Sequence, residues 1–506
     1  MNNVVQYLER SAKLWPEKIA FFTQNESITY AELLKKSKHI ASFLLHHNAR
    51  PNSIVAIYMN KNINCIAMIF GCAMARVAYA FIDINQPKNR IEKMLKLVEP
   101  KFIFTDRDLF EDISSKITDN IIIDIASALN FTIQENILEE VKNKYLSYDI
   151  LDIIFTSGST GAPKAIAKTH SNVLYFIPTF VSEFNFTNDD IFANQAPLDF
   201  DVSIKDIYSC VYIGASVLLI DRSFFAMPMK LMKLLIDHKV SILIWAVSAL
   251  TLLSSFKVFK HYVPSDIKKV FFSGEVMPLN QLNIWQSNLP DTEFINLYGP
   301  SEITCNCTFY RLKNNNCYKY QSIPIGKAFN GQKVFLLAFD NENKPYEIKK
   351  EGEVGEICVC GPNIALGYYN DIERTNKFFI QNPLNSNYYE RIYKTGDMGK
   401  YDENGELIFQ GRKDFQIKHL GHRIELGEIE AIVMNIEGVE LACAIYKNNK
   451  IYLFYTGLHD IDTLASILKK QLSLYMFPSK ILKLNNFPLN KNGKINRIQL
   501  KEKLYE

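Results

Sequence analysis

One glycine- and hydroxyl-rich stretch has the composition of a phosphate-binding loop. An apolar run ends at Phe155 and is followed by Thr156-Ser157-Gly158-Ser159-Thr160-Gly161-Ala162-Pro163-Lys164. Glycines let a backbone turn tightly and bring its N–H groups close to an anion, and the hydroxyls and Lys164 add donors. The order is not that of a Walker loop, because GxxxxGK[ST] is missing. A flexible surface loop is the alternative, but the Pro163-Lys164 ending favours phosphate binding.

Asp201 is the carboxylate most open to a substrate role. It lies in Phe200-Asp201-Val202-Ser203, just before an apolar helical run at 204–214. A buried charge needs a partner, although an Asp at a helix start is often only an N-cap. Asp199 or Ser203 could cap instead, which weakens that explanation for Asp201. Lys205, one helical turn on, either enters the same pocket and favours a polar or acidic ligand or faces solvent.

Three further segments carry isolated charged residues beside turn residues. Glu302, whose carboxylate is a hard oxygen ligand, ends the run Asn296-Leu297-Tyr298-Gly299-Pro300-Ser301-Glu302. Asp397, a hydrogen-bond acceptor when ionised, follows Thr395-Gly396. Lys494 lies in a polar C-terminal turn. Taken singly, each is better explained by an ordinary turn or a solvated side chain.

Two cysteine pairs, Cys305/Cys307 and Cys358/Cys360, have CxC spacing that is compatible with zinc. Both lie in runs that favour strands, where period-two spacing places the two thiols on one face. No histidine stands at ligand spacing beside them, so we expect no metal at these cysteines. The nine cysteines are an odd number spread along the chain, which favours reduced thiols and a cytoplasmic location.

The elements that must position these residues alternate between strand and helix. Apolar strands flank a helical run at 53–83, and strand-then-turn units recur at 240–253 and 269–278. This alternation predicts parallel βα units and an α/β fold. Ligands of open α/β sheets bind at the carboxyl ends of the strands. We therefore expect the strand ends near residues 244–245 and at Ser273 to line a pocket. The pattern leaves open whether Ile244 or Trp245 faces it.

Length and charge exclude several classes of protein. A chain of 506 residues exceeds one compact core, so two or three subdomains are expected. Its net charge of +3 suggests no capture of nucleic acid. The longest uncharged run, 240–256, is short and contains four serines, so we expect no membrane span. The N-terminus lacks a signal-peptide apolar region.

Six motifs, in order, resemble those of the adenylate-forming superfamily, which includes acyl-CoA synthetases, luciferases and amino-acid adenylation domains. They are TSGSTGAPKAIAKTH, FDVS, NLYGPSE, YKTGD, GRKDFQIK and PLNKNGKINR, and the resemblance runs from about residue 10 to 500. Five positions depart from the family pattern: Ala165 for glycine, Arg76-Val77 for two glycines, Val247 for proline and Ser301 for threonine. The hydroxyl survives at Ser301, so phosphate contact is still expected there.

The resemblance implies a large N-terminal domain, 1–412, of packed α/β and β subdomains and a small mobile α+β domain, 413–506. It implies that Lys494 and Glu302 are catalytic, that Glu302 holds Mg²⁺, that Asp414 is the hinge and that Gly421 faces the incoming thiol. The implied ATP-binding residues are Thr156, Ser157, Gly158, Ser159, Thr160, Gly161, Lys164, Asn296, Tyr298, Gly299, Ser301, Asp397 and Arg412. The expected substrate-binding residues are Phe200, Asp201, Val202, Lys205, Ser273, Leu297 and Cys305.

The implied function is ATP- and Mg²⁺-dependent activation of an amino acid as aminoacyl-AMP, with transfer to the phosphopantetheine thiol of a separate carrier protein. In amino-acid adenylation domains the aspartate that matches Asp201 holds the substrate's ammonium. D-alanine–carrier protein ligases and stand-alone nonribosomal-peptide-type enzymes fit the motifs equally well. An acyl- or aryl-CoA ligase is disfavoured by Asp201, and a scaffold by the filled catalytic positions. Because no carrier module follows the last motif before Glu506, we expect a free-standing, monomeric activating enzyme in the cytoplasm.

Overall fold

The computed structural model describes residues 1–117, 120–157, 163–312, 323–413, 415–488 and 495–504. The chain forms two compact units. The first comprises Met1–Ile84, Val98–Ile154 and Ile166–Lys413, and the second comprises Asn85–Leu97, Phe155–Ala165 and Asp414–Glu506. Among the described residues, no helix combines the length and the apolar character needed to cross a membrane.

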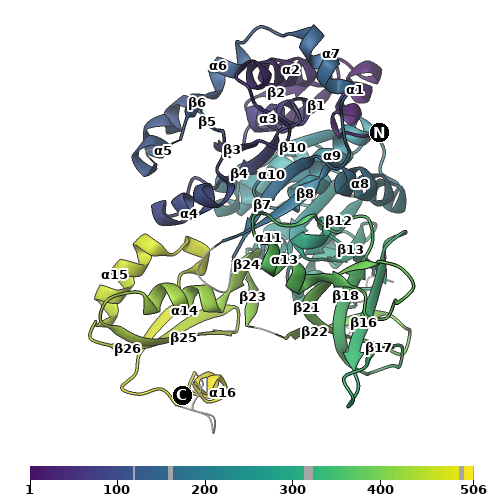
Figure 1. Ribbon diagram of the computed structural model, residues 1–506. Helices are drawn as coiled ribbons and strands as arrows, with labels where there is room; N and C mark the ends of the chain where they lie inside the picture. Colours follow the sequence, from purple (N-terminus) through teal and green to yellow (C-terminus); the bar gives the residue numbers. More distant parts are fainter. Residues whose placement is uncertain (118–119, 158–162, 313–322, 414, 489–494, 505–506) are drawn as a thin grey trace. The chain divides into compact units, whose positions relative to one another are not determined.

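Two largely parallel sheets build the first unit, as the strand–helix alternation predicted (Figure 1). One has the strand order β15-β14-β13-β12-β11-β9-β10-β1-β2, and the other has the order β19-β8-β7-β4-β3-β5-β6. The strands of the first sheet are β1 (Ile19–Phe22), β2 (Ser27–Thr29), β9 (Ile191–Asn194), β10 (Ser216–Leu219), β11 (Ile242–Ala246), β12 (Lys269–Ser273), β13 (Glu293–Tyr298), β14 (Thr308–Arg311) and β15 (Lys327–Ala328). Those of the second are β3 (Ile54–Tyr58), β4 (Ala78–Phe81), β5 (Phe102–Thr105), β6 (Ile122–Asp124), β7 (Ile150–Thr156), β8 (Lys164–Thr169) and β19 (Gly367–Tyr368).

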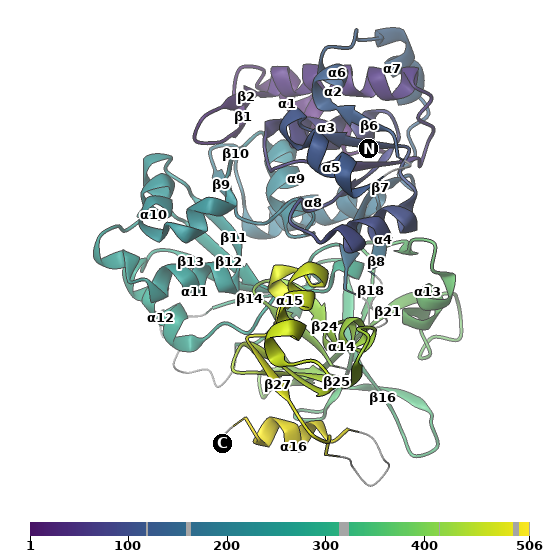
Figure 2. The same ribbon diagram turned by 90° about the vertical axis from the view of Figure 1, so that its left-hand side faces the viewer.

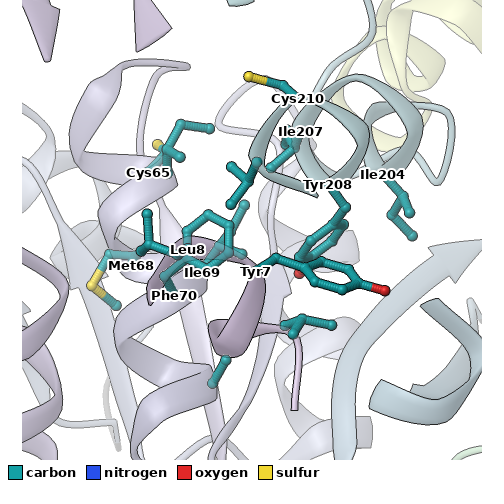
Figure 3. Packing of buried hydrophobic residues seen from close by; sticks show 14 of the residues in the cluster. Tyr7, Leu8, Cys65, Met68, Ile69, Phe70, Ile204, Ile207, Tyr208 and Cys210 are labelled. Carbon is teal, nitrogen blue, oxygen red and sulfur yellow. The ribbon is translucent and has the colours of Figure 1, made fainter. Parts of the chain in front are cut away.

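The main apolar core joins both sheets to the helices α1 (Val5–Leu14), α2 (Tyr30–His46), α3 (Ile63–Met74), α8 (His170–Phe184) and α9 (Ser203–Ile213). Helix α3 is buried from Cys65 to Met74, which explains why its sequence is apolar on every face. Figure 3 shows α1, α3 and α9 contributing Tyr7, Phe70 and Tyr208 to this core. Helix α2 begins with a capping box, in which Thr29 and Glu32 each accept a hydrogen bond from the other's backbone N–H.

The remaining helices of the first unit are shorter or lie on other faces. They are α5 (Phe110–Lys116), α6 (Ile125–Leu129), α7 (Glu135–Lys142), α10 (Pro228–Asp237), α11 (Val247–Ser255), α12 (Leu279–Asn288), α13 (Ile372–Phe378) and the 3₁₀ turns η1 (Arg107–Leu109), η2 (Arg222–Ala226), η3 (Val258–Lys260) and η4 (Ser301–Ile303). Helices α10, α11 and α12 pack with strands of the first sheet in a second apolar core.

An antiparallel sheet completes the first unit, with the order β17-β16-β18-β21-β20 and β22 paired to β21 (Figures 1 and 2). Its strands are β16 (Lys333–Phe339), β17 (Pro345–Ile348), β18 (Gly355–Cys360), β20 (Phe379–Gln381), β21 (Arg391–Tyr401) and β22 (Leu407–Arg412). Asp397 on β21 is paired in register with Arg412 on β22. The antiparallel ladder therefore brings together two residues that are 15 positions apart in the chain.

The second unit contains a two-stranded and a three-stranded sheet. Its elements are most of α4 (Lys88–Val98), β23 (Gln416–His419), β24 (His422–Glu425), α14 (Leu426–Met434), β25 (Val439–Lys447), β26 (Lys450–Gly457), α15 (Ile461–Gln471), η6 (Leu474–Met476), β27 (Lys480–Lys483) and α16 (Arg497–Glu502). Apolar residues of α14, α15 and these strands form its core, including Ile429, Leu453 and Leu468.

A buried histidine at the start of α8 forms a hydrogen bond with the N-terminal segment of the chain. The backbone N–H of Val4 donates to Nδ1 of His170 at 3.3 Å. Burial lowers the pKa of His170 to about 4. Protonation of Nδ1 would replace the acceptor with a second donor, so the native state requires the neutral ring.

Because the native state requires a neutral His170 ring, we predict that the protein loses stability in acid. An unfolded histidine has a pKa near 6.5, so the native state has its full stability above that pH and loses it as the pH falls towards about 4. The shift corresponds to about 3 kcal/mol. We expect the thermal unfolding midpoint of wild type to fall more steeply between pH 6.5 and 4 than that of His170→Gln. His261→Gln, at an exposed position, is the control and should follow wild type; equal slopes for all three proteins would contradict the prediction.

Candidate active site

The segment from Tyr298 to Cys307 shapes the candidate site. Strand β13 ends at Tyr298, and the chain then turns back so that the N–H of Cys307 donates to the carbonyl of Tyr298 at 2.9 Å. Thr304 and Cys305 both adopt left-handed backbone angles, with φ of 53° and 76°. The expectation that Cys305 and Cys307 lie in a strand is therefore wrong, since β14 begins only at Thr308.

Gly299 permits this turn. A Cβ at Gly299 would lie 2.6 Å from Cα of Asn306 and 2.6 Å from the carbonyl oxygen of Cys305. Both are backbone atoms of residues 304–307, which we call the returning segment. A side chain at Gly299 could therefore be accommodated only by displacing this segment. The twisted conformation of Thr304 and Cys305 costs energy, which suggests that the position of the returning residues serves a function.

We expect Gly299→Ala to lower stability by about 1–3 kcal/mol, because overpacking against backbone cannot be relieved by a side-chain rotation. Thermal unfolding measures the change. Gly352→Ala is a comparison for backbone strain alone, since Gly352 has a φ of 77°, which Gly299 does not share, and an added Cβ there meets nothing within 4 Å. A Gly299→Ala midpoint equal to that of wild type would show that the contact is not tight.

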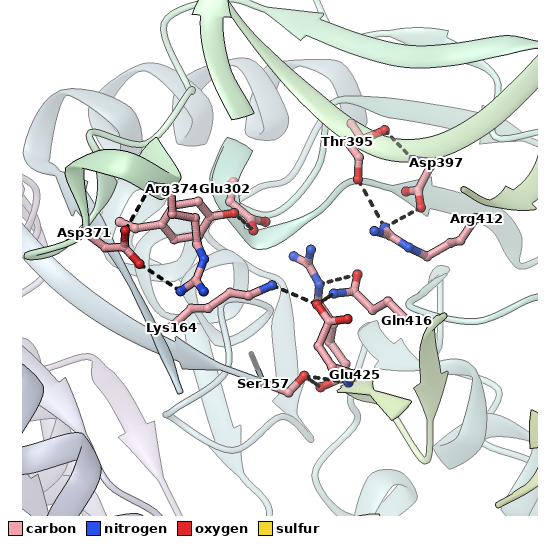
Figure 4. Close-up of polar contacts among 12 residues, drawn as sticks. Ser157, Lys164, Glu302, Asp371, Arg374, Thr395, Asp397, Arg412, Gln416 and Glu425 are labelled. Carbon is pink, nitrogen blue, oxygen red and sulfur yellow. Dashed lines mark hydrogen bonds and ion pairs between the residues drawn. The ribbon is translucent and has the colours of Figure 1, made fainter. Parts of the chain in front are cut away.

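Tyr298, Asp397 and Arg412 form one buried hydrogen-bonded group. The Tyr298 hydroxyl donates to Oδ2 of Asp397 at 2.5 Å, and Nη1 of Arg412 donates to Oδ1 at 2.6 Å. Arg412 also donates to the carbonyl of Thr395, and Figure 4 shows its guanidinium directed towards Asp397 beside Thr395. These three residues, all predicted to bind nucleotide, are thus brought together by strands β13, β21 and β22.

Glu302 is fully buried within the 3₁₀ turn after β13. Its Oε1 accepts a hydrogen bond of 2.7 Å from the hydroxyl of Tyr368 on β19. The described residues contain no group of three or more His, Cys, Asp or Glu side chains able to hold a metal ion. A divalent cation at Glu302 would therefore depend on oxygens of a ligand, which is the usual arrangement for magnesium bound with phosphates.

Asp201 is buried, with 8% of its surface exposed. Helix α9 begins at Ser203 without a side-chain cap, so the capping alternative for Asp201 is excluded. Within the described part of the chain, the Asp201 carboxylate accepts no hydrogen bond and forms no ion pair. Its backbone carbonyl accepts from the thiol of Cys305 at 2.8 Å, which connects Asp201 to the returning segment. Lys205 is also fully buried, so the solvent-facing alternative for this residue is wrong.

The other predicted residues of the first unit lie on the same strand ends and turns. Leu297 and Ser273 are buried at the carboxyl ends of β13 and β12. Asn296 donates its side-chain amide to the carbonyl of Pro324 at 2.8 Å. Phe200, Val202 and Ser301 are partly exposed.

The described ends of the phosphate-loop segment belong to the second unit. Ser157 Oγ donates to the carbonyl of Arg423 at 2.6 Å and accepts from the N–H of Glu425 at 3.1 Å. Nζ of Lys164 lies 2.8 Å from Oε1 of Glu425, and both side chains are buried (Figure 4). Thr156 lies at the end of β7, and Gly421 has a φ of 80° in the turn between β23 and β24. Gly158, Ser159, Thr160, Gly161, Asp414 and Lys494 lie outside the described residues.

Sequence reasoning missed three partners of the predicted residues. Tyr368 contacts Glu302, Asn306 contacts Lys205 and Glu425 contacts Lys164, across 66, 101 and 261 positions of the chain. Asn306 lies in a run that we interpreted as a strand, and Tyr368 lies outside the six motifs. Their only local signal is a polar group in an otherwise apolar or glycine-rich stretch.

The fold matches that of solved adenylation domains. A family model described as AMP-binding enzyme matches residues 8–369. The chain therefore belongs to the AMP-binding enzymes, the adenylate-forming superfamily that its motifs resemble. Its fold is that of the solved Vibrio cholerae adenylation domain AlmE in complex with glycyl-adenosine-5'-phosphate, with a TM-score of 0.85 over all of this chain and 98% of that one, at 20% identity. The α/β fold prediction is confirmed.

Relatives of matching length are also found. Zwittermicin A synthase ZmaJ of Bacillus cereus is 30% identical over 98% of this chain and 94% of its own length. D-alanine–D-alanyl carrier protein ligase of Bacillus cytotoxicus is 29% identical over 98% of both chains. Tyrocidine synthase 3 of Brevibacillus parabrevis is 28% identical, but only 7% of its length is matched. The fold is shared equally with o-succinylbenzoate CoA synthetase (MenE) of Bacillus subtilis, at a TM-score of 0.82 and 20% identity, over 98% of both chains.

Proposed function

We propose that this protein activates an amino acid with ATP and transfers it to the phosphopantetheine thiol of a carrier protein. In the first step the substrate carboxylate attacks the α-phosphate of ATP, and pyrophosphate leaves. In the second step the thiol attacks the acyl carbon, and AMP leaves with the electron pair of the cleaved acyl–phosphate bond. Membership of the AMP-binding enzymes and the full-length similarity to a carrier protein ligase support this assignment.

The observation that carries the amino-acid assignment is the state of Asp201. Its carboxylate is buried, does not cap α9, and has no hydrogen-bond or ion-pair partner within the described residues. A buried unpaired carboxylate is costly unless a ligand supplies a positive charge. The α-ammonium of an amino acid supplies such a charge, whereas a fatty or aryl acid does not.

The group around Asp397 fits the nucleoside end of ATP. Arg412 and Tyr298 hold one oxygen each of the Asp397 carboxylate. A carboxylate has about four acceptor positions, so two remain for ribose hydroxyls. Glu302 fits as the protein ligand of a magnesium ion that binds together with the phosphates, and when bound that ion neutralises phosphate charge.

Lys164 fits as a phosphate ligand because it already binds an acidic oxygen. Its ammonium pairs with the carboxylate of Glu425, and a phosphate oxygen of ATP would take that carboxylate's place. We further propose Lys494 as the group that neutralises charge at the reacting carboxylate and α-phosphate, Asp414 as a hinge between the two half-reactions, and Gly421 as the residue beside the thiol. These three roles derive from the family motifs.

The identity of the substrate distinguishes an amino-acid-activating enzyme from an acyl- or aryl-CoA ligase, because the two classes share this fold. An amino-acid-dependent exchange of pyrophosphate into ATP is expected with one or a few of the twenty L-amino acids or D-alanine. Exchange driven only by fatty or aryl acids would assign the protein to the acyl-CoA ligases, and exchange with no acid would refute adenylation. The second step is tested with free pantetheine as the acceptor, by detecting aminoacyl-pantetheine in a mass spectrum. Adenylation without any thioester product would refute the transfer step.

A further inference from the structure

A cluster of buried charged side chains surrounds Asp201. Lys168 on β8 and Lys205 and Asp206 on α9 have no exposed surface, and Asp152 on β7 is 1% exposed. All of them belong to the first unit. Burying this many charges would lower the stability of a purely structural core. Each charged group therefore needs a partner.

Three members of the cluster have such partners. Nζ of Lys168 lies 3.2 Å from Oδ2 of Asp152, which forms a fully buried ion pair. Oδ2 of Asp206 accepts from Nδ2 of Asn194 at 2.8 Å. Burial raises the pKa of Asp206 to about 7, which shifts this carboxyl group towards its neutral form. Asp206 also faces a second ammonium, that of Lys61.

Lys205 is the member without a matching anion. Its Nζ donates to Oδ1 of Asn306 at 2.6 Å, and within the described residues it makes no other hydrogen bond and no ion pair. An ammonium carries three donors, and a single neutral acceptor does not compensate its burial. Burial lowers the pKa of Lys205, while the neighbouring Cys305, Asp201 and Asp206 oppose that shift. Asp201 is the remaining nearby carboxylate, and the proposed function commits it to the substrate's ammonium.

The returning segment adds a second donor at the same place. Since a lysine offers only donors, Asn306 must turn its Oδ1 towards Lys205. Its Nδ2 group makes no hydrogen bond to any described residue, and the side chain is 2% exposed. The twisted backbone of Thr304 and Cys305 holds Asn306 in this position. The Lys205 ammonium and the Asn306 amide N–H therefore offer two adjacent donors close to Asp201. Two adjacent donors of this kind can bind the carboxylate of a ligand.

We propose that the amino acid activated by this protein has a carboxylate side chain, bound by Lys205 and Asn306 while Asp201 holds its α-ammonium. This proposal rests on the proposed function. The substrate's two charged groups then complete the cluster, because its ammonium neutralises Asp201 and its side chain neutralises Lys205. A neutral amino acid would leave Lys205 buried without an anion.

Two nearly isosteric pairs test the proposal on the wild-type enzyme. ATP–pyrophosphate exchange is measured with aspartate against asparagine and with glutamate against glutamine, as L and D forms, and with alanine of both hands. We expect one of the acids to exceed its own amide by about 10²-fold in kcat/KM, because the amide leaves the ammonium unneutralised. Highest exchange with a neutral or basic amino acid would overturn this proposal and leave the proposed function intact. Exchange with no amino acid would instead overturn the proposed function.

A variant pair separates recognition from a structural role. Lys205→Met should lower kcat/KM for the acid by about 10²-fold or more and abolish the preference for acid over amide, with the KM for ATP unchanged. Lys38→Met is the control, because Lys38 pairs at the surface with the exposed Glu135, and it should behave as wild type. An equal loss of activity for acid and amide would assign Lys205 a structural role. If Lys205→Met shows no thermal transition, the wild-type comparison decides the question.

Discussion

Asp201→Ala is expected to lower kcat/KM for the amino acid by about 10²–10³-fold while leaving the KM for ATP near its wild-type value. Removing one partner of a buried charge pair costs about 3–5 kcal/mol, because the other charge stays buried and unpaired. Here the abandoned charge would be the substrate's ammonium, beside the buried Lys168 and Lys205. The two KM values from ATP–pyrophosphate exchange separate this effect from a general loss of folding.

A substrate analogue without the α-amino group gives a matched control for this experiment. Wild type should discriminate strongly against the analogue, and Asp201→Ala should discriminate little, since the pair is then incomplete in both cases. Such a cycle isolates the interaction between the two groups. If the variant keeps the wild-type discrimination, the ammonium binds elsewhere and the amino-acid assignment loses its main support.

Asp397→Ala is expected to reduce kcat/KM for ATP by about 10²–10³-fold. The substitution removes an acceptor that Tyr298 and Arg412 share and deprives the largely buried Arg412 guanidinium of its ion pair with Asp397. The loss of the proposed ribose contacts adds to that cost. The measurement is the dependence of exchange on ATP concentration at saturating amino acid.

Two controls accompany Asp397→Ala. Asp397→Asn keeps the size of the side chain and can still accept hydrogen bonds, so it should lose less activity than alanine. Asp189→Ala, at an exposed position, should change neither parameter. A folded Asp397→Ala protein with an unchanged KM for ATP would remove Asp397 from the nucleotide site.

Local sequence patterns predicted the elements of this protein well. The capping box at Thr29 and Glu32, and the parallel unit of β3, α3 and β4, depend on spacing within a few residues or on the periodicity of apolar side chains. Such patterns act through backbone geometry and burial, so they can be recognised without the rest of the chain. The turn at Tyr298-Gly299-Pro300 can also be recognised from local sequence. The close packing of residues 305–307 against Gly299 cannot.

The order of residues identifies the chemical groups that are present: the hydroxyl- and glycine-rich loop, the carboxylates Asp201, Glu302 and Asp397, and the α/β elements that carry them. The folded chain was needed to show that Asp201 is not a helix cap, that Lys205 is buried rather than solvated, and that Cys305 lies in a twisted turn instead of a strand. The partner of a buried charge depends on contacts between residues far apart in the chain. Asn306 reaches Lys205 across 101 positions, and no short-range spacing encodes that contact.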